Sequence, residues 1–164
     1  MVLAVHGVVA GALATVARAN PVTGFFIGFL SHFLLDAFPH WDYFHLLPSF
    51  SKQEGQKVRH LQFVRDIFWI CCDIGLGVLL SLLFFVFHRD LGGVVTKGVF
   101  WAIIGSIVPD VLQYLAMKLP WKPLTLFRRL HDYFHSKTKL NGAAAFGIGI
   151  QVVVVILAAS LTFF

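Results

Sequence analysis

The chain has 164 residues, of which 58% are hydrophobic and only 13% are charged, and its mean hydropathy is +0.80. A soluble domain normally has about a quarter of its residues charged, so this composition excludes an ordinary soluble domain and favours an integral membrane protein. The formal net charge of +5 does not indicate a nucleic-acid partner, because the basic residues lie in loops beside apolar segments.

Five apolar segments are expected to form membrane-spanning helices. They cover residues 2–17, 21–38, 63–87, 94–117 and 142–163. Asn20 and Pro21 are typical of a helix cap and a first helical residue, and the adjacent Cys71 and Cys72 are expected to be small buried apolar side chains. The aromatic and basic connections, about 39–62 and 118–141, are expected to be amphipathic segments at the headgroup layer. The sequence therefore predicts one all-α, polytopic membrane domain over residues 1–164.

Basic residues are distributed unequally between the two sides that these spans define. Three fall on one side, namely Arg18, Arg89 and Lys97. Ten fall in the two long connections on the other side, namely Lys52, Lys57, Arg59, Arg65, Lys118, Lys122, Arg128, Arg129, Lys137 and Lys139. Because the more basic side is normally cytoplasmic, we expect the N-terminus and both connections in the cytoplasm, with a prokaryotic inner membrane as the location.

Histidines and aspartates from distant parts of the sequence converge on this cytoplasmic side. They are His6, His32, Asp36, His40, Asp66, Asp73, Asp110, His131 and His135. His88 and Asp90 fall on the opposite side. This convergence predicts a polar site near the cytoplasmic surface.

Helical spacing indicates which faces of the segments meet. In the second segment, Gly24, Gly28, His32 and Asp36 are each four residues apart and share one face of a helix. Small residues allow a neighbouring helix to approach closely, so His32 and Asp36 should face that neighbour. Comparable stripes occur in the first, third and fourth segments. They are His6, Ala10 and Ala14 in the first, Asp66, Asp73 and Gly77 in the third, and Ala102, Ser106 and Asp110 in the fourth.

The cost of burying these carboxylates favours a bound metal ion. An ionised Asp at the centre of a bilayer costs about 2.5–3.5 kcal/mol. The sequence places no Lys or Arg within the spans near Asp36, Asp73 or Asp110, so a divalent ion would supply the missing positive charge. Histidine and aspartate are ligands for zinc and manganese. The expected ligands are His6, His32, Asp36, Asp110, His131 and His135.

Other residues are expected to support chemistry around the metal. An unligated carboxylate, Asp66 or Asp73, is a candidate general base. The candidates for binding an anionic substrate are Arg128, Arg129 and Lys137. Each of these residues could instead have a structural role: capping a helix, lying solvated in a loop, or, for the basic residues, setting the orientation of the chain in the membrane. Whether His40 and Asp42 join the site or are solvated stays open.

Four short segments resemble a known family. A His near the start of the first span, GFLSHFLLD at 28–36, VPD at 108–110 and HDYFHS at 131–136 together resemble the predicted membrane-bound metal-dependent hydrolases, which include the LexA-regulated inner-membrane hydrolases of bacteria. In this chain the SHxxxD segment precedes the other two motifs, and HDYFHS lacks the Gly and Thr of the family's form. The resemblance implies a class of enzyme and no particular substrate.

These observations favour a membrane-embedded, metal-dependent hydrolase that acts on a phosphoester of a lipid or lipid-linked substrate. The alternative is a divalent metal-ion carrier, or a metal-binding membrane protein without hydrolytic activity. A carrier would use the same ligands and a polar path, for which Ser81, Ser106 and Gln151 are the candidates. A homodimer could complete the pocket if five spans do not enclose it.

Overall fold

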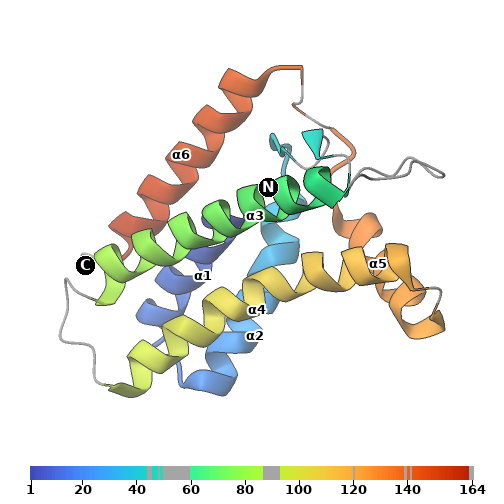
Figure 1. Ribbon diagram of the computed structural model, residues 1–164. Helices are drawn as coiled ribbons and strands as arrows, with labels where there is room; N and C mark the ends of the chain where they lie inside the picture. The colour runs from blue at the N-terminus through green and yellow to red at the C-terminus, as the bar shows by residue number, and fades with distance from the viewer. Residues whose placement is uncertain are drawn as a thin grey trace.

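The computed structural model describes residues 1–43, 46–47, 49, 60–86, 93–119, 121–138, 140 and 142–162. These residues form six α-helices, and a five-residue π-helical segment, η2 (Leu82–Val86), extends the third (Figure 1). The helices are α1 (Leu3–Val16), α2 (Pro21–Asp36), α3 (His60–Ser81), α4 (Gly93–Lys118), α5 (Lys122–Phe134) and α6 (Ala144–Ser160). The expected all-α class is confirmed.

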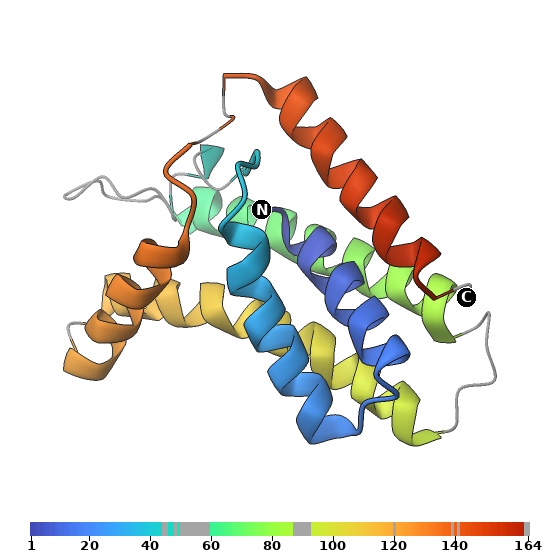
Figure 2. The ribbon, with the colours of Figure 1, turned by 180° about the vertical axis from the view of Figure 1, so that it is seen from behind.

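The predicted start of the second helix is also confirmed. Pro21 is its first residue, and the side chain of Asn20 accepts hydrogen bonds from the backbone N–H groups of Val22 and Thr23, both at 3.0 Å. These bonds satisfy two of the backbone donors that a helix leaves unpaired at its N-terminus. The turn before Asn20 contains Arg18 with a positive φ of 46°. This tight turn reverses the chain, so α1 and α2 lie side by side (Figure 2).

Helix α4 packs against both α1 and α2 through small residues. A Cβ atom added to Gly28 would overlap the carbonyl oxygen of Ala102, so the two backbones are in direct contact there. On the α1 side, Ala10 and Ala14 form a buried core with Val99, Ala102 and Ile103. The small-residue stripes therefore mark the helix contacts that the sequence predicts, and they place His32 and Asp36 on the buried face of α2.

The outer surface of the helices is apolar. On α2, the buried stripe ends in two polar residues, whereas the opposite face exposes large apolar side chains at spacings of four residues. These are Val22, Phe26, Leu30 and Leu34. Cys71 and Cys72 are also exposed on α3, so the expectation that they are buried is wrong: they lie on the outward face of that helix. Helix α2 thus exposes its large apolar side chains and buries its polar ones, whereas an amphipathic helix of a soluble protein does the opposite.

Among the residues that the structure describes, two helices are long and apolar enough to cross a membrane. They are α3 with its π-helical extension, over His60–Phe85, and α4, over Gly93–Met117. Helices α1, α2 and α6 have 14, 16 and 17 residues. At 1.5 Å per residue they are about 21–26 Å long, less than the hydrocarbon thickness of about 30 Å. The expectation of five spans is thus not confirmed, although a helix occurs in each expected segment.

The connection expected at 118–141 contains α5, which buries Leu124 and His131 on one face. Most of the other connection, 39–62, lies outside the described residues, as do His88 and Asp90.

Candidate metal centre

Four helices bring the polar residues together. The start of α1 lies beside the end of α2 (Figure 2), while α4 and α5 contribute Asp110 and His131. Pro109 lies within α4 at this level and is fully buried. A proline within a helix disturbs the preceding turn, and the Ser106 carbonyl oxygen in this turn accepts a hydrogen bond from His32 Nδ1 at 2.8 Å.

The first group of potential ligands contains His32, Asp36, Asp110 and His131. One ligand atom from each lies within 4.8 Å of the others. The Nε2 atoms of His32 and His131 are 3.1 Å apart, and His32 Nε2 lies 3.3 Å from Asp36 Oδ2. Asp110 Oδ1 lies 3.5 Å from His131 Nε2 and 3.7 Å from His32 Nε2. The group draws on three helices, of which α2 is far in the sequence from α4 and α5.

These spacings fit a single small metal ion. Four nitrogen and oxygen ligands at about 2.0–2.1 Å from a tetrahedral ion lie about 3.3 Å from one another. The measured separations between nitrogen and oxygen atoms, from 3.1 to 3.7 Å, are close to this value. The group could therefore hold a metal ion.

Backbone carbonyl groups orient three imidazoles toward the site. Because a carbonyl oxygen only accepts, Nδ1 carries the proton that His32 donates to Ser106, and its Nε2 is left with a lone pair when the ring is neutral. His40 Nδ1 donates in the same way to the Phe38 carbonyl at 2.8 Å, and His135 Nδ1 to the Ser136 carbonyl at 3.3 Å. A hydrogen bond that fixes the tautomer of a ligating histidine is characteristic of metal sites.

A second group adjoins the first through Asp36. One ligand atom each from Asp36, His40 and His135 lies within 4.8 Å of the others. Burial lowers the pKa of both His40 and His135, which favours neutral imidazoles capable of binding a metal ion. The sequence leaves open whether His40 and Asp42 are solvated, and the structure buries both, because the chain after Pro39 folds back against the helix bundle.

His6 lies against the same carboxylate but outside both groups. Its Nε2 is 3.2 Å from Asp36 Oδ1, and its ring stacks on His32 with centroids 4.3 Å apart. The side chain is fully buried, and its Nδ1 makes no hydrogen bond to any residue that the structure describes. The amino group of Met1 also contacts Asp36 Oδ1, at 3.0 Å.

The structure places Asp73 and Asp66, the two candidate general bases, outside these groups. Asp73 caps α1: its carboxylate accepts hydrogen bonds from the backbone N–H groups of Leu3 and Ala4, at 2.7 and 3.0 Å, and from the Tyr43 hydroxyl at 2.8 Å. Burial raises the pKa of Tyr43, so its hydroxyl keeps the proton that it donates. Asp66 is buried and accepts a hydrogen bond from the Ser49 backbone N–H at 3.0 Å.

The three candidate anion-binding residues differ in position. Arg128 precedes His131 by three residues and therefore lies near the same face of α5, where its Nε is 3.7 Å from Asp132 Oδ2. Arg129 is two residues from His131, which turns it by about 200° to the opposite face. Arg129 and Lys137 are both exposed.

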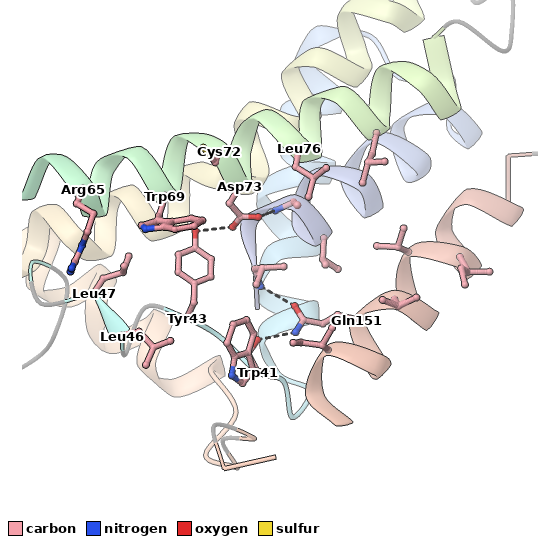
Figure 3. A pocket seen from close by; sticks show the side chains of 18 residues that line it. Trp41, Tyr43, Leu46, Leu47, Arg65, Trp69, Cys72, Asp73, Leu76 and Gln151 are labelled. Atoms are coloured by element: carbon pink, nitrogen blue, oxygen red, sulfur yellow. Dashed lines mark hydrogen bonds between the residues drawn. The ribbon is translucent and has the colours of Figure 1, made fainter. Parts of the chain in front are cut away.

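An apolar cavity of about 860 Å³ lies beside the metal centre, between α3, α6 and the start of α1 (Figure 3). Its lining is mainly aliphatic and aromatic, with Tyr43, Arg65, Asp73 and Gln151 as polar members. Val2 and Trp41 line the cavity, and their chain neighbours Met1 and His40 face Asp36. The cavity and the metal centre thus share a wall.

Sequence reasoning left His40 open and missed the carbonyl groups that orient the imidazoles. The available signal for His40 was its spacing, since His32, Asp36 and His40 are each four residues apart. Comparison of the chain with protein-family models, with curated protein sequences and with solved structures gave no match.

Proposed function

We propose that the protein is a membrane-embedded, metal-dependent phosphoesterase that acts on a lipid-linked substrate at the cytoplasmic headgroup level. The observation that carries this proposal is the convergence of His32 and His131 on Asp36 and Asp110 in a buried site, with ligand spacings that suit one ion. Zinc or manganese matches the mixture of imidazole and carboxylate ligands.

The chemistry follows from the ligands and their exposure. A divalent ion bound there would activate a water molecule at neutral pH and polarise a phosphoryl oxygen. Among the cluster residues, Asp110 and His135 have the most exposed side chains, at 19% and 20%, so the substrate would approach from their side. Asp73 is not included as a base because both of its oxygens accept hydrogen bonds from the start of α1.

The surroundings suit a substrate with an anionic head and an apolar chain. Arg128 lies near the His131 face of α5 and can pair with a phosphate, since its contact with Asp132 is long and partly exposed. The apolar cavity beside the cluster has a volume suited to an apolar chain. Together these features support a lipid phosphoester over a soluble phosphate compound.

The apolar outer surface supports a membrane location. Soluble monomers rarely expose apolar patches larger than a few hundred Å². Here α2 exposes a stripe from Val22 to Leu34, and α6 exposes Val152, Val153 and Ile156. If all five apolar helices are immersed, α1, α2 and α6 would require local thinning of the bilayer or water at their polar ends.

The structure gives less support to a divalent-metal carrier. The three polar residues proposed to line a path are used in packing: Ser81 Oγ donates to the Gly7 carbonyl and Ser106 Oγ to the Ile103 carbonyl. Gln151 Nε2 donates to the Trp41 carbonyl at 2.9 Å (Figure 3). Side chains held in such hydrogen bonds are poorly suited to bind and release an ion that moves along a path.

Elemental analysis of protein purified in detergent without chelators tests the proposal. We expect at least one zinc or manganese ion per chain, and its loss in His32→Ala and Asp110→Ala. Asp132→Ala, which removes an exposed carboxylate of α5, is the matched control and should retain the ion. The loaded protein should then release phosphate from phospholipids or polyprenyl phosphates. Metal-free wild-type protein, after exposure to zinc and manganese, would refute the proposal.

A further inference from the structure

Asp36 presents its two carboxylate oxygens to different sets of side chains. Oδ2 lies 3.3 Å from His32 Nε2 and 3.7 Å from His131 Nε2 of the first group, and 3.6 Å from His135 Nε2 of the second group. Oδ1 lies 3.2 Å from His6 Nε2 and 3.8 Å from His40 Nε2. A carboxylate with ligands facing each oxygen is able to bridge two ions, as in enzymes whose metal ions are about 3.5–4 Å apart.

His40 and His135 are positioned together by the backbone as well as by their own side chains. The Ser136 N–H donates to the Asp36 carbonyl at 2.7 Å, and the Leu140 N–H donates to the His40 carbonyl at 3.3 Å. These bonds tie the chain after α5 to the chain after α2. As a result the two imidazole rings lie 5.0 Å apart, and His135 Nε2 is 3.6 Å from Asp36 Oδ2.

His6 provides an independent indication of a ligand on the Oδ1 side. A fully buried imidazole without a hydrogen bond is costly, because each unsatisfied polar group costs about 1–3 kcal/mol. Nδ1 of His6 has no hydrogen-bond partner among the described residues, and the Asp36 carboxylate is the contact of Nε2, with Oδ1 at 3.2 Å. A cation bound at Oδ1 would lie beside this nitrogen.

We propose that a second divalent ion binds between Asp36, His40 and His135, with His6 lying beside it against Asp36 Oδ1, so that Asp36 bridges two ions. This inference rests on the metal centre of the proposed function and extends it from one ion to two. Two imidazoles and a carboxylate are ligands suited to zinc or another transition-metal ion. The first ion would retain His32, Asp110 and His131.

The test is the number of zinc ions bound per chain. The full-length protein in detergent is saturated with zinc, desalted and measured by elemental analysis. Wild-type protein should hold two zinc ions, and His40→Ala and His135→Ala should each hold one. The control is His60→Ala, which changes an exposed histidine at the start of α3 and should hold two. Circular dichroism and gel filtration verify that each variant is folded. If either His40→Ala or His135→Ala does not fold, the other still tests the second ion.

Manganese provides a second readout. Two manganese ions bridged by Asp36 should give an exchange-coupled paramagnetic resonance signal, which His40→Ala should convert to that of an isolated ion. One ion per chain in both wild-type protein and His40→Ala overturns the inference and leaves the Met1 amino group as the partner of Asp36 Oδ1. Two ions without phosphoester hydrolysis would support the inference and refute the proposed function. One ion per chain, with phosphoester hydrolysis retained in His40→Ala, would refute the second ion and support the proposed function.

Discussion

Replacing Asp73 by alanine is expected to destabilise the protein without removing its metal ion. The carboxylate lies on α3 and accepts two backbone hydrogen bonds from the start of α1, and a third from the Tyr43 hydroxyl (Figure 3). Val2, which precedes α1, makes no capping hydrogen bond with its side chain. Asp73 therefore caps α1 from a different helix, and its charge is also favourable at the positive end of the α1 dipole.

The size of the effect follows from these three bonds. Loss of a helix N-cap costs about 0.5–2 kcal/mol, and an unsatisfied, partly buried hydroxyl such as that of Tyr43 adds about 1–3 kcal/mol. A total of about 1.5–5 kcal/mol corresponds to a decrease in the melting temperature of roughly 3–20 °C for a chain of this size. Asp73→Asn keeps one acceptor oxygen and should lie between wild-type protein and Asp73→Ala.

The assay is thermal unfolding in detergent, with zinc content and phosphoester hydrolysis measured on the same samples at a temperature where all variants are folded. Cys71→Ala, two residues earlier and exposed, is the control and should melt within about 2 °C of wild-type protein. Both Asp73 variants should retain their metal. If Asp73→Asn melts like wild-type protein but loses hydrolysis, Asp73 is a catalytic base and the capping argument fails.

Three further predictions concern packing, metal and substrate. Gly28→Ala should lower the free energy of unfolding by at least about 1–3 kcal/mol, because a Cβ would overlap the Ala102 carbonyl. The control Gly75→Ala, where a Cβ would meet open space, should be neutral or stabilising in the same melting assay. Removing the metal with a chelator should lower the melting temperature, since a ligand at 100 times its Kd stabilises by about 2.7 kcal/mol; an unchanged temperature would contradict a bound ion. Arg128→Ala should raise KM for a lipid phosphate several-fold more than Arg129→Ala, and equal effects would remove Arg128 from the substrate site.

Periodicity was sufficient to predict the contacts made by α2. The stripe from Gly24 to Asp36 is visible in the sequence, and the structure packs its small residues against α4 while it buries its polar end. The cap at Asn20 is equally local, because its partners lie within three residues. Patterns of this kind depend on residues that are close in the sequence, so they can be recognised without the fold.

The role of Asp73 could not be predicted in this way. Its partners are backbone N–H groups 69 and 70 residues away, and a backbone amide leaves no trace in the sequence. The position of His40 stayed open for a related reason. A histidine that follows Pro39 can be solvated or can face the bundle, and it is the turn after α2 and the hydrogen bond from the distant Leu140 N–H that keep it against Asp36.

The helix ends give a further electrostatic reason for a cation at this site. Asp36 is the last residue of α2, and His131 lies in the last turn of α5, so both helices direct the negative ends of their dipoles toward the cluster. Two carboxylates in the same place add to this negative potential. Helix α1 presents its positive end nearby, but Asp73 already caps it. The Met1 amino group offsets one of these charges, and imidazoles that bind a metal ion are neutral, so the cluster is a favourable place for a divalent cation.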